Sequence, residues 1–436
     1  MRASGVLALA FSLTLAPCAW TQEPAGATSS APLAAKVTLL AADGGRVDWS
    51  PDGSRIAFDR LGADGFYDVW VMNADGTGAV NLTDRKSGLP SKHCGNPAWH
   101  PSGKYLVFQA EKEEAPRFLD RQAEPGSGVL NDLWVIAADG SGARRVWRLD
   151  EAQLRRPDRA KDEFPRQMER MARRRQEQAE RRAWRDDPST PRPVTERDLR
   201  TAEPPPDPEM RSFRREKGRR AWKEVPGTLH PHFSPDGRKL VWAERTGSEN
   251  RPFGSWLLRV GTFSIGADGP VLSDVKSYAP FGAIFYESHS FSPDGSKVLF
   301  TANPDRRLDV CILDLATGRA EDLMRGFADW NEHAHFSPDG RAILFMSSRG
   351  YPFRARPLEL KTEFWLMAAD GSGKRRLTGF NDPASPDYRG GATAVAADSS
   401  WAPDGRRFAG LVITASPEGP ERGKGFIALV EPARSP

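Results

Sequence analysis

The stretch WNEHAHFSPDGRAILF, residues 330–345, decides the fold of this chain. Its second half places an aromatic residue, Phe336, ahead of Ser-Pro-Asp-Gly and an apolar run. Proline presets the first φ of a tight turn, aspartate hydrogen-bonds to nearby backbone amides, and glycine accepts the positive φ that follows. Because alternating apolar residues flank the turn, the unit predicts two antiparallel strands that are half buried.

The same unit recurs along the chain. Counting close variants there are six copies, and their aromatic leaders are Trp49, Trp99, Phe233, Phe291, Phe336 and Trp401. The intervals between these leaders are 50, 134, 58, 45 and 65 residues, so all but one are near the length of a propeller blade. A second repeated turn, such as Asn73-Ala-Asp-Gly76, follows most copies and predicts the hairpin between the third and fourth strands of a blade.

The two ends of the repeat array complement each other. The last copy is followed by only two strand candidates, residues 408–413 and 426–430. An apolar run near the start, residues 36–40, lacks preceding strands of its own. We expect this run to complete the sixth blade, because closure of the ring removes open sheet edges. The predicted fold class is all-β, a single six-bladed β-propeller closed by an N-terminal strand.

The aromatic-Ser-Pro-Asp-Gly repeat resembles that of the TolB-like, WD40-like (PD40) β-propeller repeat family, and the resemblance covers most of the chain. It implies an envelope protein that binds a protein or acidic glycan partner at one propeller face without catalysis. Loops on a rigid scaffold are where such a protein places its binding residues. We expect a monomer.

Composition limits the possible partners. The formal charge is only +4 over 436 residues, so composition gives no reason to expect nucleic-acid binding. With 39% apolar residues the chain can bury a large core, and the repeat period favours one ring over several independent domains. The chain has no Gly-x-Ser-x-Gly, no P-loop and no Cys-based zinc motif.

The N-terminal residues predict export. Residues 1–21 combine Arg2 with an apolar run and small residues, which indicates a signal peptide because the run is too short to span a bilayer. The protein is therefore expected in the periplasm or outside the cell. Lipidation at Cys18 is the less favoured alternative, since Pro17 stands where a lipoprotein has a small residue. Residues 22–35 are small and polar and predict a disordered linker.

The rest of the chain divides around an insertion. Residues 36–150 hold blades 1 and 2, and residues 223–436 hold blades 3 to 6. Residues 151–222 contain 21 Lys or Arg against 15 Asp or Glu, and their second part is rich in proline. We expect a solvated charged helix and a flexible linker here. The alternative is a basic arm that touches an anionic envelope surface.

The first half of the opening stretch carries the candidate chemistry. Each histidine concerned lies within three residues of an aromatic leader, in three successive blades. Neutral imidazoles that converge from neighbouring strands suit a divalent transition metal such as Mn or Zn. The alternative is that they fill polar positions and hydrogen-bond to backbone. The candidate metal ligands are His230, His232, His289, His333 and His335.

This arrangement is similar to that of oligogalacturonate lyases, propellers in which a His-x-His pair and a histidine of another blade hold manganese. The resemblance implies that His333 and His335 form the pair and His289 is the distant ligand, while Trp330 stands where the family has a glutamine ligand. Two functions therefore stay open. We favour a non-enzymatic binding scaffold, because no catalytic residue can be named. The alternative is a metal-dependent lyase or hydrolase that acts on acidic oligosaccharides.

Overall fold

The computed structural model describes residues 35–432, except residues 85, 116–122, 150–225, 248–253, 305–306, 326, 328, 353–358 and 416–422. The predicted signal peptide, the basic insertion and all but the last residue of the predicted linker lie outside the described residues. The chain divides into two compact units, and the one described below comprises Met1–Leu149, Pro226–Thr246 and Arg251–Pro436. Among the described residues, no helix has the length and apolar character needed to cross a bilayer.

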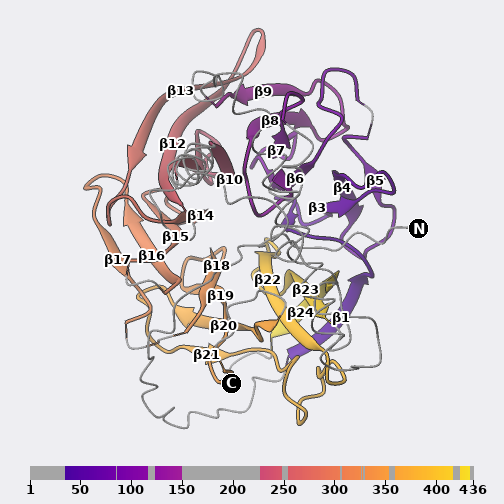
Figure 1. Cartoon of the computed structure of the whole chain (residues 1–436), viewed down its shortest axis with the longest axis vertical. Coiled ribbons are helices and arrows are strands. Elements are labelled where there is room, and N and C mark those ends of the chain that lie inside the picture. The colour runs from indigo at the N-terminus through magenta and orange to yellow at the C-terminus, as the bar shows by residue number, and fades with distance from the viewer. Residues whose placement is uncertain are drawn as a thin grey trace, which may run out of the picture. The chain divides into compact units, whose positions relative to one another are not determined.

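The described strands form six four-stranded antiparallel sheets that lie around a ring (Figure 1). The first three sheets, each in the order of its hydrogen-bonded strands, are β2 (Val47–Trp49), β3 (Arg55–Leu61), β4 (Tyr67–Asn73) and β5 (Val80–Asn81); β6 (Cys94–Trp99), β7 (Tyr105–Glu111), β8 (Asn131–Ala137) and β9 (Arg144–Trp147); and β10 (Gly227–Phe233), β11 (Lys239–Gly247), β12 (Ser255–Gly266) and β13 (Gly269–Tyr278).

The other three sheets repeat this order. They are β14 (Tyr286–Phe291), β15 (Lys297–Ala302), β16 (Asp309–Asp314) and β17 (Ala320–Asp322); β18 (Asn331–Phe336), β19 (Ala342–Ser347), β20 (Glu363–Ala368) and β21 (Arg375–Arg376); and β22 (Thr393–Trp401), β23 (Phe408–Ala415), β24 (Gly423–Pro432) and β1 (Ala35–Ala41). The predicted six-bladed propeller is confirmed.

The first strand of each blade lies nearest the ring axis. The strands β2, β6, β10, β14, β18 and β22 each contact the first strands of both neighbouring blades, so that the contacts form a closed circle. We call the space around this axis the channel. Any position that recurs in these six strands is therefore brought close to its counterparts across the channel.

The repeated turn has the chemistry that the sequence predicts. In blade 5, Ser337 Oγ donates to Asp339 Oδ1 at 2.6 Å, and the Arg341 amide donates to the same oxygen at 3.1 Å. The hydrogen bond from Ser337 lowers the pKa of Asp339 below its ordinary value. Gly340 has a φ of 72°, which costs a glycine little. The turn aspartates thus have a structural role within their own blades.

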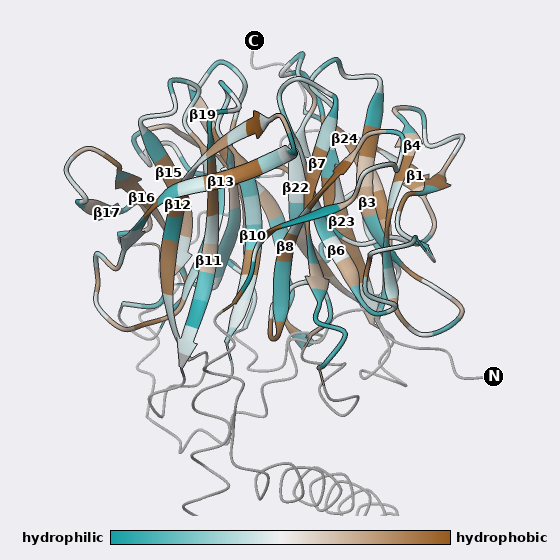
Figure 2. Ribbon diagram, turned by 90° about the horizontal axis from the view of Figure 1, so that it is seen from above, coloured by the Kyte–Doolittle hydropathy of each residue, from teal (hydrophilic) through white to brown (hydrophobic). Residues whose placement is uncertain are grey.

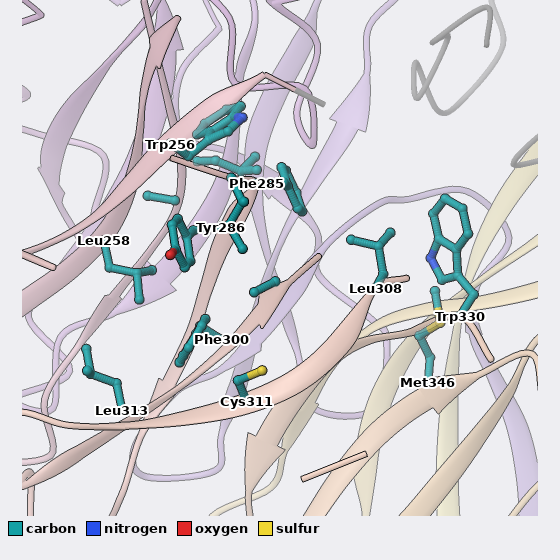
Figure 3. Packing of buried hydrophobic residues seen from close by; sticks show 14 of the residues in the cluster. Trp256, Leu258, Phe285, Tyr286, Phe300, Leu308, Cys311, Leu313, Trp330 and Met346 are labelled. Atoms are coloured by element: carbon teal, nitrogen blue, oxygen red, sulfur yellow. The ribbon is translucent and has the colours of Figure 1, made fainter. Parts of the chain in front are cut away.

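The core lies between neighbouring blades. In Figure 2 the hydrophobic colour lies mainly along the strands. Figure 3 shows one cluster that joins blades 3, 4 and 5, with Trp256, Leu258, Phe285, Tyr286, Phe300, Leu308, Cys311, Leu313, Trp330 and Met346 labelled. Aromatic side chains bury large areas, so such clusters hold the sheets in their places around the ring. Cys311 is a free thiol in this cluster, and Cys94 is buried and free in another.

Ring closure joins the two ends of the described chain. β1 pairs antiparallel with β24, with Val37 opposite Val430, and lies beside it in Figure 1. The Val37 side chain packs against the core cluster that contains Phe364 and Phe408. The expectation that an N-terminal strand completes the sixth blade is confirmed.

We expect Val37→Asp to lower the free energy of unfolding by about 1–2 kcal/mol, because it places a charge against an apolar cluster. The matched control is Leu39→Asp on the same strand, where the side chain is 59% exposed, and it should change stability by less than about 0.5 kcal/mol. Urea unfolding of both variants measures the difference. Equal losses in the two variants would contradict the packing of β1 as described.

Candidate metal centre

A β-bulge at a common place in the inner strands builds the centre. The strand register shifts after Gly95 in β6, after Leu229 in β10, after Ser288 in β14 and after Glu332 in β18. A bulge adds a residue to one strand, bends it locally and re-aims side chains, so simple alternation does not hold there. The first residues of these four bulges are Asn96, His230, His289 and His333.

The bulge explains how His289 joins the other two histidines. His230 and His333 stand three residues before their aromatic leaders, whereas His289 stands only two before its own. The bulge of β14 lies one residue closer to its leader, so His289 takes the same structural place. The backbones of His230 and His333 are left-handed, with φ of 49° and 53°, a conformation that few residues other than glycine adopt.

Three successive blades therefore each contribute one imidazole. His230, His289 and His333 each offer a nitrogen, and these atoms all lie within 4.8 Å of one another. Their ring centroids are 5.6 to 5.8 Å apart. The three side chains are buried, since the residues are 2%, 0% and 6% exposed. We call this set the His triad.

His289 is oriented by a threonine of the next strand. Its Nε2 lies 2.7 Å from Thr301 Oγ1, and its buried Nδ1 has no hydrogen-bond partner among the described residues. When Nε2–H donates to Thr301, Nδ1 keeps a free lone pair. Metal-binding histidines use one nitrogen in this way to fix the tautomer of the ring. The donor set of the His triad therefore fits a transition metal.

A buried ion network surrounds the His triad. Asp398 Oδ1 lies 2.9 Å from His333 Nδ1, and Asp398 Oδ2 lies 3.1 Å from Arg46 Nε. Burial alone would raise the pKa of Asp398, but the charges of His333 and Arg46 hold it well below its usual range. Arg46 Nε also donates to His230 Nε2 at 3.4 Å.

Two glutamates complete the network. Glu287 Oε1 lies 3.2 Å from His230 Nε2, and burial raises the pKa of Glu287 to about 8. Glu332 accepts a hydrogen bond from the indole of Trp330, and burial raises its pKa as well. Glu287 therefore favours the neutral acid near neutral pH.

The three imidazoles differ in protonation. Burial lowers the pKa of His230 and of His289 well below the ordinary value, so both are neutral, which is the form that binds metals. Burial acts in the same direction on His333, but Asp398 and Glu287 raise its pKa to about 9. His333 therefore has a proton to lose before it can act as a ligand.

The structure also places the remaining sequence candidates. His232 and His335 lie next to each other, with ring centroids 5.4 Å apart, and His335 is 6.1 Å from His289. The grouping implied by the lyase resemblance, His333 with His335, differs from the His triad, in which His333 lies with His230 and His289.

The sequence reasoning missed Arg46 and Asp398. Each stands three residues before its own leader, Trp49 or Trp401, which is also the offset of His230 and His333. Extending that count to blades without histidine is the signal that finds them.

A loop of blade 2 closes over the network. A Cβ at Gly126 would clash with the guanidinium of Arg46, and a Cβ at Gly95 would clash with Pro125. The Gly128 carbonyl accepts a hydrogen bond from the Thr228 amide at 2.8 Å. Glycines at positions 95 and 126 thus permit the close approach of this loop to β6 and to Arg46.

Sequence comparison places the chain near TolB. No family model matches it. The Tol-Pal system protein TolB of Anaeromyxobacter dehalogenans is 37% identical over a match that covers 21% of this chain and 26% of the relative. The chain thus spans about a quarter of the length of that relative in the match. The resemblance to TolB-like propellers is confirmed.

Two solved structures show similar folds. TolB of Acinetobacter baumannii has 14% identity and a TM-score of 0.42, and the match covers 89% of this chain and 63% of that one. An oligogalacturonate lyase in complex with manganese has 10% identity and a TM-score of 0.42, with coverage of 93% and 95%. At these values neither likeness bears on function, and the fold assignment rests on the strand pairing.

We expect Asp398→Asn to destabilise the metal-free protein by about 3–5 kcal/mol, because it leaves Arg46 and protonated His333 buried without their counter-charge. The matched control is Asp404→Asn, at an exposed turn where the amide oxygen can still accept from the Arg406 amide. Urea unfolding in a chelating buffer gives both values. A loss as small as that of the control would show that the network holds no net charge on Asp398.

Proposed function

We propose that this chain is a periplasmic or secreted TolB-like propeller that acts as a non-enzymatic scaffold for a protein or acidic glycan partner, and that its channel holds a structural divalent metal ion. The observation that carries the metal is the His triad, whose nitrogens lie within 4.8 Å of one another. The proposed export of the protein is supported by the signal peptide that the sequence predicts in residues 1–21.

The type of ligand narrows the choice of metal ion. Imidazole nitrogen suits Zn, Cu, Fe and Ni, while Mn prefers oxygen donors. Three imidazoles, one of them oriented by its hydrogen bond to Thr301, favour zinc among the metals that the sequence suggests. A bound ion supplies positive charge and directional bonds to blades 3, 4 and 5. It would therefore stiffen the ring that presents the partner-binding face.

The lyase alternative needs an acidic sugar to reach the metal. The triad residues are at most 6% exposed, and the neighbouring Arg46 is buried with Gly126 against its guanidinium. Arg46, a cation beside the triad, is already paired with Asp398 and is not free to bind a uronate. The described geometry therefore supports an ion held for structure better than a site for turnover.

The test is the metal content of the full, tag-free chain. We expect metal-free protein titrated with Zn²⁺ to bind at the His triad and to lose that equivalent in His289→Ala. His100→Gln serves as the control, because His100 contacts Ser102 and Gly237, outside the triad. Elemental analysis after gel filtration counts the bound ions. Absence of metal in the unmodified chain, or an equal metal content in His289→Ala, would contradict the proposed metal centre.

The role of Thr301 gives a second, finer expectation. Thr301→Val keeps the shape of the side chain but removes the oxygen that holds His289 Nε2, so zinc affinity should fall about tenfold or more. Thr301→Ser retains the hydroxyl and should bind nearly as well as the unmodified chain. Isothermal titration in competition with a chelator measures the three affinities. Equal affinities for the valine and serine variants would contradict an orienting role.

A further inference from the structure

The channel has a second level of histidines beside the His triad. His232 and His335 are the first paired residues after the bulges of β10 and β18, opposite Val241 and Leu344. They therefore occupy equivalent places in blades 3 and 5. Their rings approach edge to face, with centroids 5.4 Å apart and planes at 72°. We call these two residues the His pair.

Neither ring of the His pair is satisfied within the protein. No hydrogen bond joins the imidazole of His232 or His335 to another of the described residues, although His335 is only 8% exposed. His232 is half-buried and His335 is buried, and polar groups without a protein partner at such places usually meet a water, an ion or a ligand.

A small cavity adjoins the His pair and offers the missing partners. Its polar lining consists of Asn96, His230, His232, His335, Asp398 and Ser399, together with Arg46, whose charge Asp398 balances. The lining thus combines nitrogen donors with amide, carboxylate and hydroxyl oxygens. A small cavity with such polar walls suits a single water or a bare ion better than an apolar ligand.

The spacing of the His pair matches shared coordination. Zinc lies about 2.0–2.1 Å from an imidazole nitrogen, so two rings on one tetrahedral ion have centres roughly 5 Å apart. The observed 5.4 Å is close to this value. We propose that His232 and His335 bind a second divalent transition metal ion, with water and oxygen donors of the cavity completing its coordination. This inference rests on the proposed function, since it treats the channel as a metal site.

The His triad and the His pair differ in their expected affinity for a metal ion. The His triad has three imidazoles, one of them oriented by Thr301, whereas the His pair has two and no orienting hydrogen bond among the described residues. The second ion should therefore bind more weakly than the first. Occupation of the pair leaves the triad ligands unchanged, so the two ions are separable by mutation.

The experiment is a stoichiometric titration of the tag-free, metal-free full chain with Co²⁺, followed by its visible absorption, and with Zn²⁺, followed by elemental analysis. We expect two equivalents in the unmodified chain and one in the double variant His232→Gln, His335→Gln. His289→Ala should lose the tighter equivalent and keep the weaker one. Circular dichroism of each metal-free variant checks the fold, and His100→Gln again controls for histidines outside the channel.

The outcomes separate the two proposals. One outcome is that the unmodified chain binds a single ion, which the double variant still binds and His289→Ala does not. In that case the proposed site at the His triad is supported, and the His pair is only a contact between two rings. This count needs no variant to fold, because it is made first on the unmodified chain. If the unmodified chain binds none, both proposals fall. If the double variant still binds two, the second ion lies elsewhere and the assignment to the His pair is wrong.

Discussion

The crowding of six inner strands around one axis is the constraint on which the rest of this structure depends. Each first strand contacts the first strands of both neighbouring blades, so side chains far apart in sequence meet in the channel. His333 lies 2.9 Å from Asp398 of the next blade, and Arg46 of blade 1 reaches the same carboxylate. Charges gathered so tightly must balance, because an unpaired buried charge is expensive.

Protonation provides part of this balance. The protein holds Arg46 and protonated His333 against Asp398, while Glu287 favours its neutral form and burial raises the pKa of Glu332 in the same direction. Such a set of groups is an uncommon choice for a core that only needs to fold, since apolar residues of similar size are often as stable or more so. The ion proposed for the channel would replace some of these protons and is consistent with the presence of these groups there.

The fold was readable from sequence because its signal is local. The Ser-Pro-Asp-Gly turn is explained by hydrogen bonds within a few residues, as in Asp339, and six copies at blade spacing leave little choice of architecture. The site was only partly readable. The five histidines were found from their places before the leaders, but their grouping depends on bulges, which shift by one residue in β14 and leave no mark in the sequence. Arg46 and Asp398 were missed because only histidines were considered. The residues that meet in the channel share a position relative to the aromatic leader and not a residue type.

The pairing of β1 with β24 sets the order of events during synthesis. Lys36 lies opposite Glu431, so the strand made among the first must wait for nearly the last before its blade exists. Contacts of such large sequence separation slow folding, since the loop entropy is lost before the contact forms. Until β1 and β24 pair, each leaves an open strand edge, so the ring is complete only once two strands far apart in the sequence have met.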